Sequence, residues 1–318
     1  DFCYKDSFYK GGRSFYTQAV DDALREINRL PGRHVFFLDD HLFGDERFAE
    51  ALFDGMRGMN RLWQAAGTVA SALKPRLIEK AVACGLRSLF IGFESVRPAA
   101  LTRYNKRHNV FCDYEKAVAS LHQMGVMING SFVFGMDDEG PDVFPYTVDW
   151  AIRHSIETAT FHILTPYPGT ALFDRMQAER RLLHTRWDLY DTRHAVYLPL
   201  RMTPEELEEG YWTAYRDFYR WGSIVHSAGG QESWAKVFRH LMYCGAWKKC
   251  EPAWNFIIKC RRIGAMRPLM EALLSRLRQP DIMVEHRAHE RVFKRGCRFF
   301  YPGEEMALPF APGERERL

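Results

Sequence analysis

Hydrophobic and polar positions between residues 17 and 166 follow two periods in turn. Five short apolar runs are typical of buried strands, and they lie at 34–38, 62–69, 88–92, 126–134 and 160–164. The segments between them repeat apolar residues every three or four positions, which predicts amphipathic helices. Helix boundaries fit this division, because Thr17 and Pro75 stand where helices should begin, and Gly85 and Gly125 where they should end.

Strands that alternate with helices predict parallel β-α units, as in part of an α/β barrel or in a doubly wound sheet. In both folds, ligands bind at the C-terminal ends of the strands. Polar and turn-forming residues gather at these ends, and they are Asp39, Asp40, Glu94, Ser95, Gly135, Tyr167 and Gly169. Each also has an ordinary explanation, since such residues make turns and cap helices. Together they predict one binding edge of the sheet.

The sequence changes character after residue 170. Residues 171–230 are rich in aromatic side chains and contain a clear helix start, with Thr203 as the cap and Pro204 as the first helical residue. We therefore expect a barrel-like domain over 1–170 and an aromatic-rich helical extension over 171–230. Residues 231–295 predict an amphipathic helical region, and residues 296–318, which contain several Pro and Gly, predict a loop or a disordered tail.

The composition of the 318 residues permits a large core, since 47% of them are hydrophobic. The net charge of +4 is too small to indicate a nucleic-acid partner. Seven cysteines at scattered spacings do not suggest a disulfide framework or a common zinc site, which favours a reducing, cytoplasmic location. No apolar run reaches about 18 residues, so the sequence predicts no membrane-spanning helix.

One cysteine stands apart because of its position. Cys3 precedes the helix expected from Thr17, where a loop would follow a strand upstream of that helix. Iron–sulfur clusters are held by closely spaced thiolates, so Cys3 is a candidate ligand. A lone cysteine is more often an inert buried thiol. The assignment of Cys3 as a cluster ligand therefore depends on the other motifs.

Together these motifs resemble the radical S-adenosylmethionine (SAM) superfamily. That family binds a four-iron cluster through Cys-x-x-x-Cys-x-aromatic-Cys after its first barrel strand, and Asp1-Phe2-Cys3 looks like the end of this motif. The chain would then be a fragment that starts inside the motif. Further segments, over roughly residues 1–225, are similar to the cobalamin-associated branch of the family: 12–14, 26–27, 36–40, 92–95, 132–135, 164–170 and 215–219.

The resemblance implies a partial (β/α)6 TIM-like barrel that lacks its first strand and is followed by a helical C-terminal region. It implies a [4Fe-4S] cluster with Cys3 as one metal ligand, and SAM as the molecule that is cleaved. Asp39 and Asp40 stand where the family usually has Gly-Gly-Glu for the SAM amino group, which is a departure from the pattern. Glu94 and Ser95 would bind the ribose or the amino-acid end, and Gly135 with the turn at Tyr167 and Gly169 would allow backbone to approach the adenine.

Partners are also expectations from the resemblance. A small-molecule or lipid-like substrate would be modified, with an electron donor such as a flavodoxin or ferredoxin. Cobalamin would bind to a domain that precedes the cluster motif and is not in this chain, and methyl transfer is one reaction that it would support. We expect the 318-residue fragment to be inactive alone.

Two alternatives stay open. The chain could be a degenerate, non-catalytic barrel that binds a partner through its basic C-terminal part, since residues 231–318 hold 17 Lys and Arg against 10 Asp and Glu. Within it, helices expected over 231–278 could pack on the aromatic stretch or contact an anionic membrane surface. We expect packing, with the basic residues as a solvated face.

Overall fold

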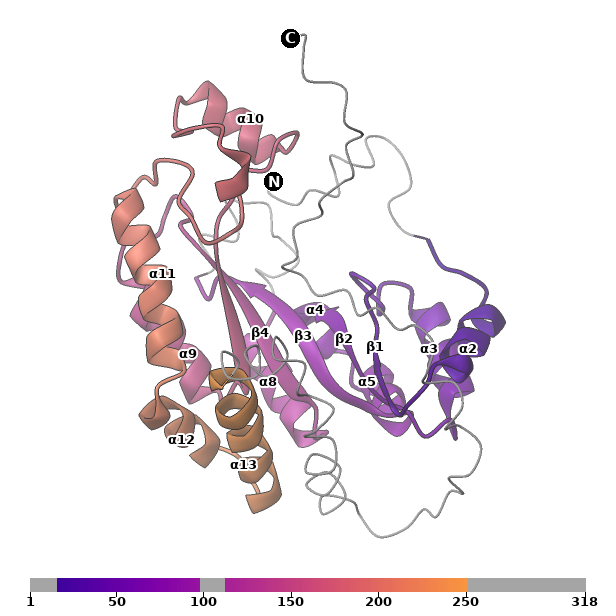
Figure 1. The fold of residues 1–318 in the computed structure, drawn as a ribbon. Helices are drawn as coiled ribbons and strands as arrows, with labels where there is room; N and C mark the ends of the chain where they lie inside the picture. The colour runs from indigo at the N-terminus through magenta and orange to yellow at the C-terminus, as the bar shows by residue number, and fades with distance from the viewer. Residues whose placement is uncertain (1–15, 98–111, 251–318) are drawn as a thin grey trace, which may run out of the picture. The chain divides into compact units, whose positions relative to one another are not determined.

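The computed structural model describes residues 16–97 and 112–250, and these residues belong to one unit that spans Asp1–Phe256. Its centre is a parallel sheet in the order β1-β2-β3-β4-β5 (Figure 1). The strands are β1 (His34–Phe36), β2 (Leu62–Thr68), β3 (Leu86–Glu94), β4 (Met127–Phe134) and β5 (Thr158–Ile163). Each strand pairs with the next one along the chain, so the predicted partial barrel is confirmed.

Helices connect the strands and continue after them. Those within the barrel are α2 (Val20–Arg29), α3 (Glu46–Met56), α4 (Val69–Ala72), α5 (Pro75–Ala83), α8 (Tyr114–Gln123) and α9 (Val143–Arg153). Those that follow it are α10 (Ala171–Ala178), η1 (Trp187–Leu189), α11 (Pro204–Phe218), α12 (Trp221–Gly229), α13 (Trp234–Leu241) and η2 (Met242–Lys249). The predicted cap of α11 is present as a reciprocal capping box between Thr203 and Glu206. The first helix begins later than expected, at Val20, and Thr17 does not cap it.

Aromatic side chains decide which face of the sheet meets the helices. Phe93 of β3 stacks on Phe132 of β4 with ring centroids 5.5 Å apart, and Phe132 is 5.8 Å from Phe161 of β5. Trp63 of β2 stacks on Phe53 of α3 in the same way. Because side chains alternate along a strand, the residues between these aromatic positions point to the opposite, concave face.

The outer edge of β5 is covered by residues that follow the barrel. The Tyr219 hydroxyl accepts a hydrogen bond from the N–H of Ala159 at 3.0 Å and donates one to its carbonyl at 2.7 Å. Tyr215, one helical turn earlier on α11, does the same for Phe161 at 3.1 and 3.3 Å. The N–H of Ile163 donates to the carbonyl of Thr192 at 2.7 Å. These contacts take the place that a further strand would occupy.

The strand at residues 34–38 was expected to be buried, and this expectation is wrong. Phe36 is 55% exposed and Leu38 is 83% exposed. The reason is topological, because β1 is an edge strand that pairs only with β2 in the described sheet. An apolar run alone does not distinguish an edge strand from a central one.

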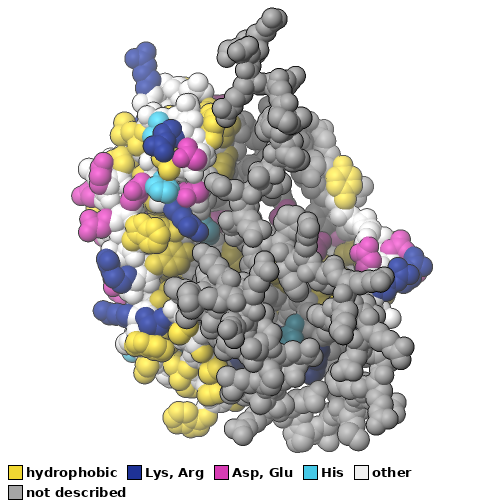
Figure 2. Space-filling model, viewed as in Figure 1, with side chains coloured by type: hydrophobic (Ala, Val, Ile, Leu, Met, Phe, Trp, Pro, Cys, Tyr) yellow, Lys and Arg dark blue, Asp and Glu magenta, His cyan; other side chains and the backbone are white. Residues whose placement is uncertain are grey.

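The described part of the C-terminal region shows a helix with one apolar side in solvent. Val237 and Leu241 of α13 are half-buried, whereas Trp234 and Phe238 are exposed. Figure 2 shows hydrophobic side chains gathered over α12 and α13, at the lower left of the view. In residues 16–97 and 112–250, no helix is long and apolar enough to cross a membrane. The predictions for 251–295 and for the tail at 296–318 lie outside the described residues.

A first prediction concerns the covered edge of β5. Tyr219→Phe removes the hydroxyl that satisfies both polar groups of Ala159, so we expect the free energy of unfolding to fall by about 1–3 kcal/mol in denaturant titrations. Tyr146→Phe is the matched control, since Tyr146 is exposed on α9 and should change stability by less than about 0.5 kcal/mol. Equal stability of the two variants would contradict this account of the edge.

A second prediction compares two glycines that each end a helix before a strand. Gly85 has φ +112°, and an added Cβ would overlap the carbonyl oxygen of Arg61. Gly125 has φ +75°, with nothing within 4 Å of an added Cβ. We expect Gly125→Ala to cost about 1 kcal/mol of stability for the backbone conformation alone. Gly85→Ala should cost about 3 kcal/mol or more, because the backbone must also move. Similar losses of stability for both variants would show that the backbone at Arg61, just before β2, moves at little cost.

Candidate functional site

The predicted cofactor-binding residues lie at or after the C-terminal ends of their strands, as expected. Asp39 and Asp40 come after β1 and are exposed, while Glu94 ends β3 and is half-buried. Ser95 and Gly135 follow β3 and β4 and are buried, whereas Tyr167 and Gly169 belong to the turn after β5. Adjacent strands bring Ser95 and Gly135 together, but β2 lies between the aspartate pair and Glu94.

Glu94 has an unusual backbone conformation at a break in the ladder. Its φ is +64°, a value that residues other than glycine adopt at a cost, and the β3–β4 register shifts between Gly92 and Glu94. The carboxylate lies over Gly92, since a Cβ built on Gly92 would be 3.1 Å from Glu94 Oε1. The absence of a side chain at Gly92 therefore leaves room for this carboxylate on the concave face.

Ser95 is bound to a buried carboxyl group that the sequence did not single out. Its hydroxyl donates to Glu139 Oε1 at 2.9 Å, and the N–H groups of Gly135 and Met136 donate to Glu139 Oε2 at 3.0 and 3.1 Å. Burial raises the pKa of Glu139 to about 7, although these three hydrogen bonds oppose the rise. Glu139 thus fastens the end of β3 to the end of β4, and only its spacing of four from Gly135 could have drawn attention to it.

The backbone conformation and the packing at position 135 both require glycine. Its φ is +95°, and an added Cβ would overlap the hydroxyl of Tyr197 and lie 2.9 Å from Leu207 Cδ2. The Tyr197 hydroxyl donates a hydrogen bond to the carbonyl of Gly135. The extension after the barrel therefore packs directly on this strand end.

A buried ion pair also anchors the loop that follows β4. Arg181 Nη2 lies 2.6 Å from Asp137 Oδ1, and both side chains are almost fully buried. Arg181 also donates through Nε to the carbonyl of Leu198 at 2.8 Å. The loop after β4 is consequently tied to residues that come before and after η1.

The turn after β5 also starts a helix. Thr170 Oγ1 donates to the carbonyl of Tyr167 at 2.7 Å and accepts from the N–H of Phe173 at 3.2 Å, which makes it the cap of α10. Burial raises the pKa of the half-buried Tyr167. The turn thus has a structural role in addition to any role toward a ligand.

Three residues on the concave face were not chosen from the sequence as site residues. His162 lies between the buried Phe161 and Ile163, and its Nδ1 is 3.2 Å from Thr192 Oγ1. Burial lowers the pKa of His162, although the charge of Glu94 partly opposes this, and the lowered pKa favours the neutral imidazole. Asn129 Oδ1 and Thr160 Oγ1 are buried and have no hydrogen-bond partner in the described structure. Strand alternation could have found all three, had the faces been known.

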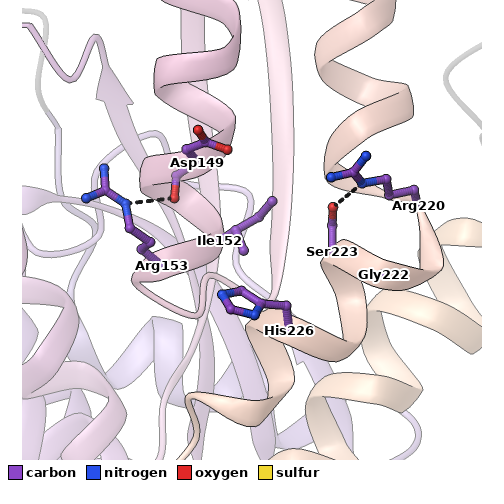
Figure 3. Close-up of a pocket in the computed structure, with 7 residues that line it drawn as sticks. All are labelled: Asp149, Ile152, Arg153, Arg220, Gly222, Ser223 and His226. Atoms are coloured by element: carbon purple, nitrogen blue, oxygen red, sulfur yellow. Dashed lines mark hydrogen bonds between the residues drawn. The ribbon is translucent and has the colours of Figure 1, made fainter.

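Two features lie away from this edge or outside the described residues. A cavity of about 250 Å³ opens between α9 and α12, lined by Asp149, Ile152, Arg153, Arg220, Gly222, Ser223 and His226 (Figure 3). Within 16–97 and 112–250, no three His, Cys, Asp or Glu residues are placed to hold a metal ion. The predicted ligand Cys3 lies outside these ranges.

The sequence has relatives among characterised proteins, although no family model matches it. It is 32% identical over 76% of its length to bacteriochlorophyllide d C-12(1)-methyltransferase of Chlorobaculum tepidum, and spans 54% of that protein. It is 24% identical over 58% of its length to hopanoid C-2 methylase of Rhodopseudomonas palustris, and spans 36% of that protein. The chain thus covers about half, or less, of these relatives.

A solved structure shows the same fold. The radical SAM methyltransferase TsrM of Kitasatospora setae, with tryptophan substrate and a SAM analogue bound, matches with a TM-score of 0.50 at 12% identity. The match covers 77% of this chain and 57% of TsrM. The parallel half-barrel, the strand-end motifs and the methyltransferase relatives agree with one another. The chain is therefore similar in sequence to methyltransferases and in fold to a radical SAM methyltransferase, in agreement with the resemblance of its strand-end motifs to the cobalamin-associated branch of that superfamily.

Proposed function

We propose that this chain is the barrel part of a radical SAM enzyme that transfers a methyl group to a small-molecule or lipid-like substrate. The observation that carries the proposal is the 32% identity, over 76% of the chain, to a methyltransferase. A related activity on a second class of substrate, a hopanoid, supports methyl transfer rather than one particular acceptor. The alternative of a non-catalytic binding module loses support, because both relatives are enzymes.

The concave face at the strand ends fits SAM by its chemistry. Asp39, Asp40 and the Glu94 carboxylate are anionic groups suited to the SAM amino group and ribose hydroxyls. Gly92 leaves room for the Glu94 carboxylate on this face, and the buried oxygens of Asn129 and Thr160 can accept hydrogen bonds from a bound molecule. We assign Ser95, Gly135 and the turn at Tyr167 and Gly169 to the same site, where the Glu139 hydrogen bonds hold two strand ends in place.

The remaining groups would come from outside the described residues. We propose that Cys3 is one thiolate ligand of a [4Fe-4S] cluster and that two further cysteines precede Asp1 in the full protein. When bound, the cluster supplies the electron that cleaves SAM. Cobalamin bound to a preceding domain, and a flavodoxin or ferredoxin as electron donor, complete the proposal. The barrel residues orient SAM and the acceptor, and the neutral His162 offers an uncharged contact to the acceptor.

The SAM site is tested by binding measurements on the full-length protein. Asp40→Ala and Glu94→Ala should each remove a charge-assisted hydrogen bond and weaken SAM binding by about 1.5–3 kcal/mol, roughly 10-fold to 150-fold in affinity. Calorimetry under anaerobic conditions measures this. Glu115→Ala is the control, because Glu115 is exposed on the outer helix α8. Unchanged affinity in both site variants would remove these residues from the site.

The cluster and the reaction are tested by reconstitution. The 318-residue chain should not hold a stable cluster, whereas a form extended upstream should hold about four irons per chain, since three thiolates are needed. The extended form should release 5′-deoxyadenosine from SAM when a reductant is added. Cys3→Ala should abolish both results, and Cys250→Ala, which changes a half-buried thiol, should leave them intact. Four irons on the 318-residue chain would contradict the proposed ligand set.

A further inference from the structure

A histidine without a hydrogen-bond partner is buried in the helical extension after the barrel. His240 of α13 is 0% exposed, and neither of its ring nitrogens has a hydrogen-bond partner in the described structure. At least one ring nitrogen of any imidazole carries a proton, so a buried donor is left unsatisfied. Such a donor costs stability, and an apolar side chain of similar size would not have this cost. Packing alone therefore does not account for histidine at this position.

His240 lies where this extension docks on the barrel. Figure 1 shows α12 and α13 at the end of the sheet opposite α10. Three side chains of residues 231–250, which we call the α13 segment, donate hydrogen bonds to backbone carbonyls that precede β4 and β5. The donors are Lys236 Nζ at 2.7 Å from the carbonyl oxygen of His122, Arg239 Nη1 at 3.0 Å from that of Gly125, and Gln231 Nε2 at 3.2 Å from that of Ser155. The α13 segment is therefore held against the N-terminal end of the barrel.

One buried carboxylate faces His240 from the barrel. Glu157, just before β5, accepts a hydrogen bond from the N–H of Ile128 at 2.9 Å, and its Oε2 lies 3.3 Å from His122 Nε2. No hydrogen bond joins Glu157 to His240, although the two are close enough for their charges to interact. The positive charges that act on His240 belong to His122 and Arg239. The other titratable side chains on the helices that pack against α13 are His226 of α12 and Tyr243, Cys244, Lys248 and Lys249 of η2.

The docked position keeps His240 neutral. Burial lowers the pKa of His240 to about 4; the negative charge of Glu157 opposes this shift, and His122 and Arg239 add to it. When the α13 segment separates from the barrel, the imidazole enters water and binds a proton near its ordinary pKa of about 6.5. Between about pH 6.5 and about pH 4, the separated form therefore binds more protons than the docked form. Docking is thus strongest above this range and weakens as the pH falls through it.

We propose that the α13 segment is an acid-sensitive element that stays docked while His240 is neutral and is released when His240 is protonated. Release breaks the three hydrogen bonds to the barrel and exposes Cys244, which lies one helical turn after His240 and is 1% exposed in the docked form. The donors Lys236, Arg239 and Gln231 do not titrate in mild acid, so the sensitivity comes from the unpartnered imidazole. This inference is independent of the proposed function, because docking requires neither cluster nor SAM.

The experiment is thiol labelling of the 318-residue chain, without cofactors, at about pH 7.5 and about pH 5.5. A pyridyl disulfide modifies thiols at both pH values, and peptide mass spectrometry gives the labelling rate of each cysteine relative to the denatured chain at the same pH. We expect the protection of Cys244 to fall roughly tenfold in acid, as the two pKa values of one titrating group require. Cys84, a buried thiol at the end of α5, should keep its protection.

Two substitutions at position 240 show whether this histidine is responsible. His240→Leu should protect Cys244 equally at both pH values, and at neutral pH at least as well as the unchanged chain does. His240→Gln keeps polar atoms but does not titrate, so its protection of Cys244 should also be independent of pH. His226→Gln is the matched control, because His226 is exposed on α12, and it should keep the acid effect.

Three results would overturn the proposal. They are unchanged or increased protection of Cys244 in acid, a parallel loss of protection at Cys84, and an acid effect that persists in both His240 variants. Increased protection would show that protonated His240 binds Glu157 and strengthens docking. A parallel loss at Cys84 would show that the barrel itself unfolds.

Discussion

A parallel sheet that does not close must satisfy the polar backbone groups on its open edge, and the fold depends on how this chain does so. Two tyrosine hydroxyls and one carbonyl cover Ala159, Phe161 and Ile163 along β5. Each hydroxyl acts as both acceptor and donor, so it replaces one residue of a neighbouring strand. The spacing of four between Tyr215 and Tyr219 fixes the rotation of α11 against the sheet. The position of α12, which follows α11 directly, depends in turn on this rotation.

The two faces of the sheet have different roles, because side chains alternate between the faces along each strand. The rings of Phe93, Phe132 and Phe161 form a continuous layer beneath the helices, and that layer leaves no place for polar groups. Asn129, Thr160 and His162 are thereby directed to the concave face. A side chain there gains little from packing on the helices, so its chemical identity is free to serve a ligand. Glu139 combines the two roles, since it is buried like a core residue yet sets the backbone at the candidate site.

The sequence predicted the order of strands and helices well, because apolar period, Pro75 and Gly85 are local signals. It also predicted that Glu94, Ser95 and Gly135 follow strand ends, since this requires only the strand boundaries. A barrel without its first strand, as the resemblance implied, would leave β1 at an edge, but the apolar pattern of residues 34–38 alone did not predict its exposure, because burial depends on neighbours in space. The partners Ser95–Glu139 and Asp137–Arg181 are each 44 residues apart, and no local pattern connects them. The family's motif at 215–219 was recognisable, but its role at the edge of β5 was not.

The loop after β4 is held by several buried contacts, and this affects where the protein unfolds locally. Asp137, Gly135 and Glu139 each bind a different part of the structure, so this strand end can separate only when several buried interactions are lost together. The end of β1 has exposed side chains and a single neighbouring strand. Local unfolding should therefore start at β1, and backbone amides there should exchange with solvent faster than those of β4. In the 318-residue chain, the β4 side of the candidate site should therefore keep its shape during such openings.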